Sequence, residues 1–289
     1  MDNSSPIQHT LAQYSRKLIS NDGLAEKTRF QQDLSTRSPL RYPGGKSRAV
    51  KKIIEFIPDG LDSLASPFFG GGSVELACAA NGVRVYGYDG FKPLVNFWQV
   101  AIENASLLAQ VVDCRYFPLS RTKFYALQKR YFSLPDRIEQ AAAFFALNRS
   151  SFSGTTLSGG MSPEHPRFTP SAIERLADLN LGNLSVDHAD FKDSLARHKN
   201  DLLYLDPPYA NGGNLYGNRG DMHDRFDHEG LADILNTRDG WVMSYNECDM
   251  VRDLYPGYRF EEPTWVYGMS NNKASNEVLI LSKDIKSVA

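Results

Sequence analysis

The sequence predicts an α/β protein, in which a parallel β-sheet with helices packed on it is interrupted by a mainly helical insertion. Residues 61–110 read as strand, glycine-rich turn, helix, strand, acidic residue and helix, which is the order of a βαβ unit. Four more strand-like segments follow residue 183, and the residues between the two halves have helical and loop-like patterns. We therefore expect a ligand at the carboxyl ends of the parallel strands.

The chain begins with a polar extension. Residues 1–36 show only weak helical periodicity. A helix is expected near residue 50, because four apolar residues recur there at the spacing of one helical face: Val50, Ile53, Ile54 and Ile57. Pro58, Asp59 and Gly60 end that helix.

The βαβ unit follows. An apolar run at 61–69 leads into three glycines, and Ser73 is expected to cap a helix that ends near Ala80. The segment VRVYGYD at 83–89 alternates in the manner of a strand and ends in Asp89. A helix is expected from about residue 94 to residue 110.

The strand pattern resumes late in the chain. Strands are predicted at 184–191, 201–209, 241–246 and 276–282, with a helix around 228–236. The intervening residues are aromatic, basic and helical. The predicted division is a polar extension (1–36), a sheet domain (37–114 and 184–289) and an inserted domain (115–183).

Composition and charge are ordinary overall but uneven along the chain. The 289 residues are 42% hydrophobic and 23% charged, and the formal net charge of −2 excludes a uniformly basic nucleic-acid coat protein. Residues 37–52 contain six basic residues and no acidic one, and residues 115–175 contain nine basic and four acidic residues. These stretches are either solvated faces or the walls of a cleft that follows a phosphate backbone.

Several classes of protein are disfavoured. No apolar run is long enough to span a membrane, and the N-terminus lacks the pattern of a secretory signal. The cysteines (78, 114 and 248) form no pair typical of a disulfide framework or a zinc site, so we expect a reducing, cytoplasmic location. The six histidines lack metal-ligand spacing, so no metal is expected, and no G-x-S-x-G motif supports covalent hydrolysis.

Two glycine-rich segments are candidate ligand sites. Lys46 lies in PGGKS, but a phosphate-loop motif would have glycine where Leu40 stands, so nucleotide hydrolysis is disfavoured. The turn FFGGGS at 68–73 allows close backbone approach to a cofactor, and Asp89 ends the next strand, where an acid can accept hydrogen bonds from ribose hydroxyls. Glu75 breaks the G-x-G-x-x-G spacing, which disfavours a plain NAD site.

The sharpest motif is Asp206-Pro207-Pro208-Tyr209, which follows an apolar strand. The prolines stiffen the turn, so that the Pro207 carbonyl becomes a fixed acceptor beside the Asp206 carboxylate. Tyr209 adds a flat ring. Two acceptors and a stacking surface suit a planar heterocycle with an NH₂ group, although an ordinary turn with a helix-capping Asp would read the same way.

Asn148 and Arg149 end an apolar helix and lead into a Ser/Gly/Thr-rich loop in the basic insertion. Asn pairs well with adenine edges, and Arg pairs well with guanine or phosphate. The pair therefore indicates either nucleic-acid contact or simply a helix end followed by a loop.

Together these motifs resemble the D12 class of DNA N6-adenine methyltransferases, the Dam-like family, in its α-group order. The resemblance covers about residues 38–282 and implies a Rossmann-like sheet that binds S-adenosylmethionine, with an inserted target-recognition domain. It implies methyl transfer to N6 of a flipped adenine in double-stranded DNA, and a restriction enzyme as a possible partner. Methylation of cytosine N4 or of RNA adenine, and a catalytically silent DNA-binding relative, remain alternatives.

The resemblance also assigns roles to individual residues. Asp206, Pro207 and Tyr209 match the catalytic motif. The matches to cofactor-binding positions are Tyr42, Lys46, Phe68, Gly70, Gly72, Asp89, Asp190, Phe191 and Asp206. The expected DNA contacts are Arg41, Lys46, Asn148 and Arg149.

Three positions depart from the family pattern. Ser66 stands where an acid usually precedes P-F-x-G-x-G, so one contact to the methionine ammonium is expected to be weakened. Tyr42 replaces a Trp and keeps the capacity to stack. The segment MSPEHPRFTP replaces the Dam-type stretch after the N-R pair, so GATC specificity is not transferred.

Overall fold

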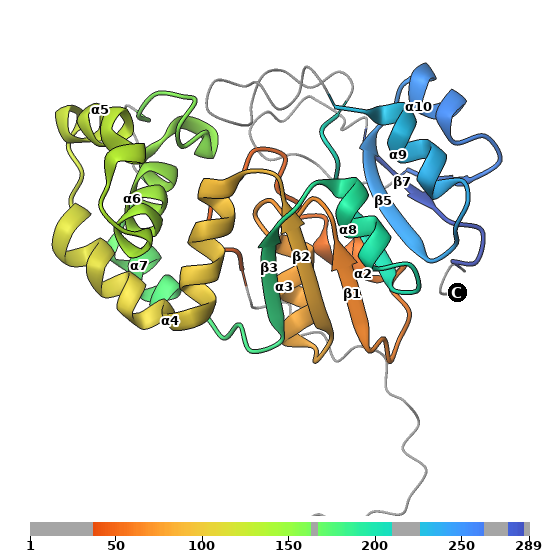
Figure 1. Ribbon diagram of the computed structural model, residues 1–289, viewed down its shortest axis with the longest axis horizontal. Helices are drawn as coiled ribbons and strands as arrows, with labels where there is room; N and C mark the ends of the chain where they lie inside the picture. Colours follow the sequence, from red (N-terminus) through yellow and green to blue (C-terminus); the bar gives the residue numbers. More distant parts are fainter. Residues whose placement is uncertain (1–36, 163–166, 210–225, 263–276, 286–289) are drawn as a thin grey trace, which may run out of the picture.

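The computed structural model describes residues 37–162, 167–209, 226–262 and 277–285. Its centre is a seven-stranded sheet in the order β3-β2-β1-β4-β5-β7-β6 (Figure 1). The strands are β1 (Ser63–Ser66), β2 (Arg84–Asp89), β3 (Leu184–His188), β4 (Leu202–Leu205), β5 (Trp241–Asn246), β6 (Arg259–Glu261) and β7 (Glu277–Leu281). Strands β1 to β5 pair in parallel, and β7 is antiparallel to both β5 and β6.

The sheet is buried on both faces. Successive side chains of a strand point to opposite faces, and Leu64 and Ala65 of β1 accordingly belong to two different hydrophobic clusters. The first cluster lies under α2 (Val50–Ile54), α3 (Ser73–Ala80) and α4 (Lys92–Tyr116). The second lies under α8 (Phe191–Arg197), α9 (His228–Leu235) and α10 (Asp249–Leu254). Burial on both faces explains why β4, and β7 after Glu277, are continuous apolar runs rather than alternating ones.

The inserted segment is helical and lies to one side of the sheet (Figure 1). It contains α5 (Arg121–Arg130), α6 (Arg137–Ser150) and α7 (Pro170–Ala177), with short 3₁₀ turns at 131–133 and 152–154. Residues 141–147 of α6 are fully buried, because this helix packs against α4 as well as its own neighbours. The predicted boundary at 114 falls inside α4, which continues to residue 116, whereas β3 begins at the predicted residue 184.

The structure differs from the sequence-based predictions at a few elements. The sequence predicts Ser73 as the cap of α3, but the N-cap is Gly72, whose φ of 66° is left-handed, and no side chain caps this helix. The parallel pattern ends at β7, which runs antiparallel. Three short elements, α8, α10 and β6, lack the length of periodic pattern that a sequence reading needs, and they were not predicted.

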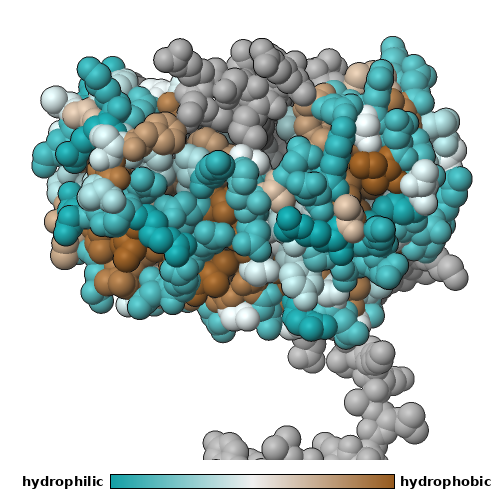
Figure 2. Space-filling view, viewed as in Figure 1, coloured by the Kyte–Doolittle hydropathy of each residue, from teal (hydrophilic) through white to brown (hydrophobic). Residues whose placement is uncertain are grey.

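One face of the protein is mostly hydrophilic, as expected when the apolar side chains are buried in the core (Figure 2). On the face shown in Figure 2, hydrophilic residues predominate and hydrophobic residues gather in separate patches. Within the described part of the chain, no helix has the length and apolar character needed to cross a membrane.

Candidate active site

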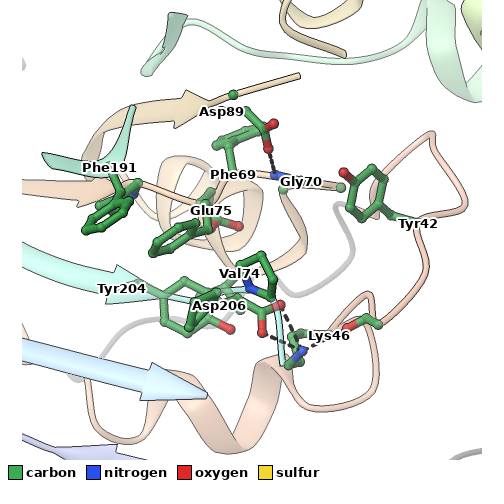
Figure 3. A pocket seen from close by; sticks show the side chains of 18 of the residues that line it. Tyr42, Lys46, Phe69, Gly70, Val74, Glu75, Asp89, Phe191, Tyr204 and Asp206 are labelled. Atoms are coloured by element: carbon green, nitrogen blue, oxygen red, sulfur yellow. Dashed lines mark hydrogen bonds and ion pairs between the residues drawn. The ribbon is translucent and has the colours of Figure 1, made fainter. Parts of the chain in front are cut away.

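A cavity of about 470 Å³ lies where β1, β2 and β4 end. We call it the strand-end cavity. Its walls come from the 42–46 loop, the glycine-rich turn after β1, Asp89, the start of α8 and the Asp206–Tyr209 segment (Figure 3). The strand order reverses between β1 and β4, and the carboxyl ends of strands at such a switch point form the usual ligand crevice of an open α/β sheet. The expected ligand position is therefore a cavity in the structure.

The glycine-rich turn is bound tightly to Asp89. Gly70 has a left-handed φ of 50°, and its N–H donates to Asp89 Oδ2 at 3.0 Å. The N–H of Phe91 donates to Asp89 Oδ1 at 2.8 Å. A Cβ at Gly70 would lie 3.0 Å from the ring of Tyr42, so glycine allows the two segments to approach. Burial raises the pKa of Asp89, and the two backbone donors act in the opposite direction.

A second acid, Glu75, lines the same cavity from the first turn of α3. Its side chain is buried, and the hydroxyl of Ser66 donates to Oε1 at 2.6 Å. Burial raises the pKa of Glu75 to about 7, the Ser66 hydroxyl opposes that shift, and the nearby Asp206 adds to it. Ser66, directly before Pro67, is not an acid, but it lies within hydrogen-bond distance of the Glu75 carboxyl group. That carboxyl group comes from α3.

Asp206 is held in a charged cluster with Lys46. Lys46 Nζ lies 2.8 Å from both carboxylate oxygens of Asp206 (Figure 3). It also lies 3.5 Å from Glu277 Oε1 and donates to the carbonyl of Gly44 at 2.8 Å. Ser244 Oγ donates to Asp206 Oδ1 at 2.9 Å. Burial raises the pKa of Asp206, and the charge of Lys46 opposes that shift. Because Lys46 is buried with these partners, its geometry favours a positioning role over a direct DNA contact.

Tyr209 completes the Asp206–Tyr209 motif. Its hydroxyl donates to Glu277 Oε1 at 2.7 Å and lies 3.2 Å from Asp206 Oδ1. Its ring stacks against Tyr245 with the centroids 5.7 Å apart, and Lys46 Nζ lies 5.1 Å from its centroid. The hydroxyl thereby fixes the ring plane beside the Asp206 carboxylate.

Aromatic rings form part of the cavity wall. Phe68, Phe191 and Phe226 pack with centroid separations of 5.3–5.9 Å, and all three line the cavity. Asp190 caps α8 by accepting from the N–H of Lys192 at 2.8 Å, which places its carboxylate at the rim. The cavity thus combines a flat apolar wall with several carboxyl groups.

The predicted DNA contacts of the insertion have different positions. Asn148 is fully buried, its Oδ1 accepts from the N–H of Arg41 at 2.8 Å, and its Nδ2 donates to the carbonyl of Arg41 at 2.7 Å. Asn148 therefore ties the insertion to Arg41, directly before the 42–46 loop, and this position argues against the direct base contact expected from sequence. Arg41 and Arg149 instead line a second, larger cavity beside the first.

Sequence reasoning missed several residues of the site. The sequence marks Glu75 only as the residue that breaks the G-x-G-x-x-G spacing, although its position shortly after the glycine-rich turn can be seen in the sequence. Four more residues come from other strands and loops, and no local sequence pattern indicates that they belong to the site: Phe226, Ser244, Tyr245 and Glu277. No group of three potential metal ligands occurs among the described residues.

Comparison with known families yields one clear match. The family model for the D12 class N6 adenine-specific DNA methyltransferases matches residues 42–269. That range includes the 42–46 loop, both acids of the glycine-rich region, the insertion and the Asp206–Tyr209 motif.

Individual relatives are more distant. The type II methyltransferase M.CviBI of Paramecium bursaria Chlorella virus NC1A is 22% identical over 76% of this chain and 86% of its own length. The type II methyltransferase M.FokI of Planomicrobium okeanokoites is 25% identical over 69% of this chain but 33% of its own length. A DNA N-6-adenine-methyltransferase of Escherichia phage P1 is 26% identical over 60% of this chain and 24% of its own length.

Proposed function

Because this chain belongs to the D12 class of N6 adenine-specific DNA methyltransferases, we propose that it methylates adenine N6 in DNA with S-adenosylmethionine as the donor. The observation that carries this proposal is the joining of two motifs in one cavity. The Asp206–Tyr209 segment, suited to an aromatic amine, faces the glycine-rich turn with its Asp89 and Glu75 carboxyls.

The strand-end cavity suits this cofactor by charge and shape. S-adenosylmethionine has an adenosine, a positive sulfur and an ammonium group, and the cavity has acids for the polar groups and rings for the base. Asp89 would hold the ribose hydroxyls, while Asp190 and the rings of Phe68 and Phe191 would hold the adenine. Glu75 would hold the ammonium group, replacing the acid that Ser66 lacks. Gly70, Gly72 and Tyr42 would shape the space around the amino acid group.

When bound, the cofactor supplies a methyl group already activated by its positive sulfur. The protein's part is to make adenine N6 a better nucleophile. Asp206 and the Pro207 carbonyl accept hydrogen bonds from the two N6 protons, which favours a pyramidal nitrogen and stabilises its developing positive charge. As the N6–carbon bond forms, the bond from that carbon to the donor's sulfur would break and leave its electron pair on sulfur, and the Asp206 carboxylate accepts the proton that N6 loses.

Lys46 sets the protonation state of Asp206 in this scheme. Burial raises the pKa of that carboxyl group, whereas a group that stabilises positive charge and accepts a proton must be ionised. The ammonium group at 2.8 Å opposes the effect of burial. Lys46 therefore acts through Asp206, as a positioning residue.

The insertion and the basic segments supply the DNA-binding part of the proposal. Residues 115–183 read the target sequence, the sheet domain at 37–114 and 184–289 performs the transfer, and the basic stretches hold the duplex. The target adenine leaves the helix to reach Asp206, and stacking on Tyr209 offsets part of the cost of unstacking. A cognate restriction enzyme belongs to the same proposal, since two of the relatives are named as type II methyltransferases.

The test uses Asp206→Asn, which keeps the shape of the side chain and removes its charge. We expect methyl transfer to DNA to fall by at least about 100-fold, because one charged group that stabilises the transition state is lost. The assay measures labelled methyl groups on DNA and identifies N6-methyladenine in the digested product. Asp187→Asn, on the exposed end of β3, is the matched control and retains activity.

Binding of S-adenosylhomocysteine by calorimetry shows that Asp206→Asn is folded. Undiminished transfer by this variant would remove Asp206 from catalysis. A wild-type product other than N6-methyladenine would overturn the proposed reaction.

A further inference from the structure

A second cavity, of about 770 Å³, adjoins the strand-end cavity. Residues 42–46, Gly71 and Ser73 line both, so the two cavities share one wall. The far wall is formed by residues of the helical insertion. We call this second cavity the arginine pocket.

Its lining is strongly basic. Six arginines from separate parts of the chain line it: Arg37 and Arg41 before the 42–46 loop, Arg48 after that loop, Arg149 at the end of α6, Arg167, and Arg175 in α7. Within the described ranges, no aspartate or glutamate lines the pocket. Positive charge is therefore concentrated at one place beside the active site.

Two of these side chains are fixed by neutral groups. Arg149 donates from Nε and Nη2 to the carbonyl of Arg167, at 3.0 and 2.8 Å, and from Nη1 to the carbonyl of Pro39 at 3.4 Å. Arg41 donates from Nη1 to the carbonyl of Ser151 at 3.1 Å. Carbonyl partners orient a guanidinium group without cancelling its charge.

The mutual repulsion of these groups is unfavourable unless an anion offsets it. Burial, together with the charges of Arg175, Arg41 and Arg167, lowers the pKa of Arg149 to about 10. Burial and the charge of Arg167 also lower the pKa of Arg41. Arginine binds phosphate oxygens in a bidentate manner and remains charged at neutral pH.

We propose that the arginine pocket binds a backbone phosphate of DNA beside the flipped adenine. The inference rests on the proposed function, because the shared 42–46 wall places the pocket next to the cavity that would receive the base. Buried Asn148 has a supporting part, since it fixes the Arg41 backbone against the insertion. A phosphate held there orients the nucleotide without reading its sequence.

The experiment measures DNA affinity as a function of salt for Arg167→Gln and Arg175→Gln. Both side chains are exposed, so these variants are expected to fold. Each phosphate contact contributes a slope of about 0.9 to the dependence of log K on log salt, and each variant should lower the slope by about that amount. The matched control is Arg84→Gln, an exposed arginine at the opposite end of β2 from Asp89, which leaves the slope unchanged.

A neutral methylphosphonate then locates the contact. One methylphosphonate at a time replaces a phosphate along a DNA duplex. The methylated site of this duplex is first identified in DNA that the wild-type protein has methylated. Wild type should lose about tenfold in affinity with the substitution beside the target adenine, and the double variant Arg167→Gln/Arg175→Gln should lose none. A separate titration with inorganic phosphate tests a free-phosphate site.

The outcomes separate the two proposals. Wild type that methylates no adenine would overturn the proposed function. Active wild type with unchanged salt slopes in both variants overturns the phosphate pocket alone. A third outcome would assign the pocket to free phosphate and also overturn the inference. In that outcome the wild type binds inorganic phosphate with micromolar affinity, and the double variant loses this binding but keeps the DNA affinity of the wild type.

Discussion

Replacing Glu75 with Gln should change stability and cofactor binding in opposite directions. The carboxyl group is buried, and its pKa is raised from 4.5 to about 7. A carboxyl group with a raised pKa binds a proton more tightly in the folded state, so folding stability falls as the pH rises from 4.5 to 7. At about 1.4 kcal/mol for each pKa unit, the charged carboxylate costs roughly 3 kcal/mol above pH 7. The neutral amide of the Glu75→Gln variant avoids this cost and can still pair with Ser66.

Thermal unfolding should therefore shift upward for Glu75→Gln at pH 8 and remain unchanged near pH 4.5. A shift of roughly 5–10 °C corresponds to that free energy in a domain of this size. Cofactor binding should weaken, because a charge-assisted hydrogen bond contributes about 1.5–3 kcal/mol, or roughly 10- to 150-fold in affinity.

Calorimetry with two ligands isolates the ammonium contact. S-adenosylhomocysteine retains the amino acid group, whereas 5′-methylthioadenosine lacks it. The Glu75→Gln variant should lose affinity only for the first ligand, and the wild-type preference for higher pH between 6 and 8 should disappear with it. Glu139→Gln, a buried acid of α6 outside the cavity, serves as the control and keeps both affinities. Equal losses for both ligands, or equal stability at pH 8, would refute this reasoning.

Three further predictions concern the site and its supports. Lys46→Met removes the charge that opposes the raised pKa of Asp206, so the pH profile of methyl transfer should move to higher pH, and an unmoved profile would contradict the coupling. Gly72 and Gly82 both have a positive φ, but a Cβ at Gly72 would lie 2.7 Å from a Phe69 ring carbon, whereas a Cβ at Gly82 would meet nothing within 4 Å. Gly72→Ala should therefore lower the unfolding free energy by about 1–3 kcal/mol more than Gly82→Ala, and equal losses in thermal unfolding would argue against the packing explanation. Asn148→Ala should speed hydrogen exchange in the 37–46 segment and weaken DNA binding several-fold while leaving binding of S-adenosylhomocysteine intact; unchanged exchange would show that the amide does not hold this segment.

Local patterns made much of the fold and part of the site predictable. The βαβ unit, the buried strands and the helix at 228–235 follow from hydrophobic periodicity and glycine-rich turns, which act over a few residues. Asp89 and Asp206 follow strands whose apolar pattern was clear, so their place at the carboxyl edge of the sheet could be expected. The antiparallel β7 and the short helices depended on packing that no local signal records.

The sequence by itself determined which chemical groups end the strands, and its motifs determined the family. The tertiary structure alone decided the partners of those groups. It pairs Lys46 with Asp206 across 160 positions, and Asn148 with Arg41 across 107. It also places Glu75 against Ser66, where the usual acid is missing. Hydrogen bonds and charge clusters between distant residues depend on how elements pack, and periodicity along the chain contains no information about that packing.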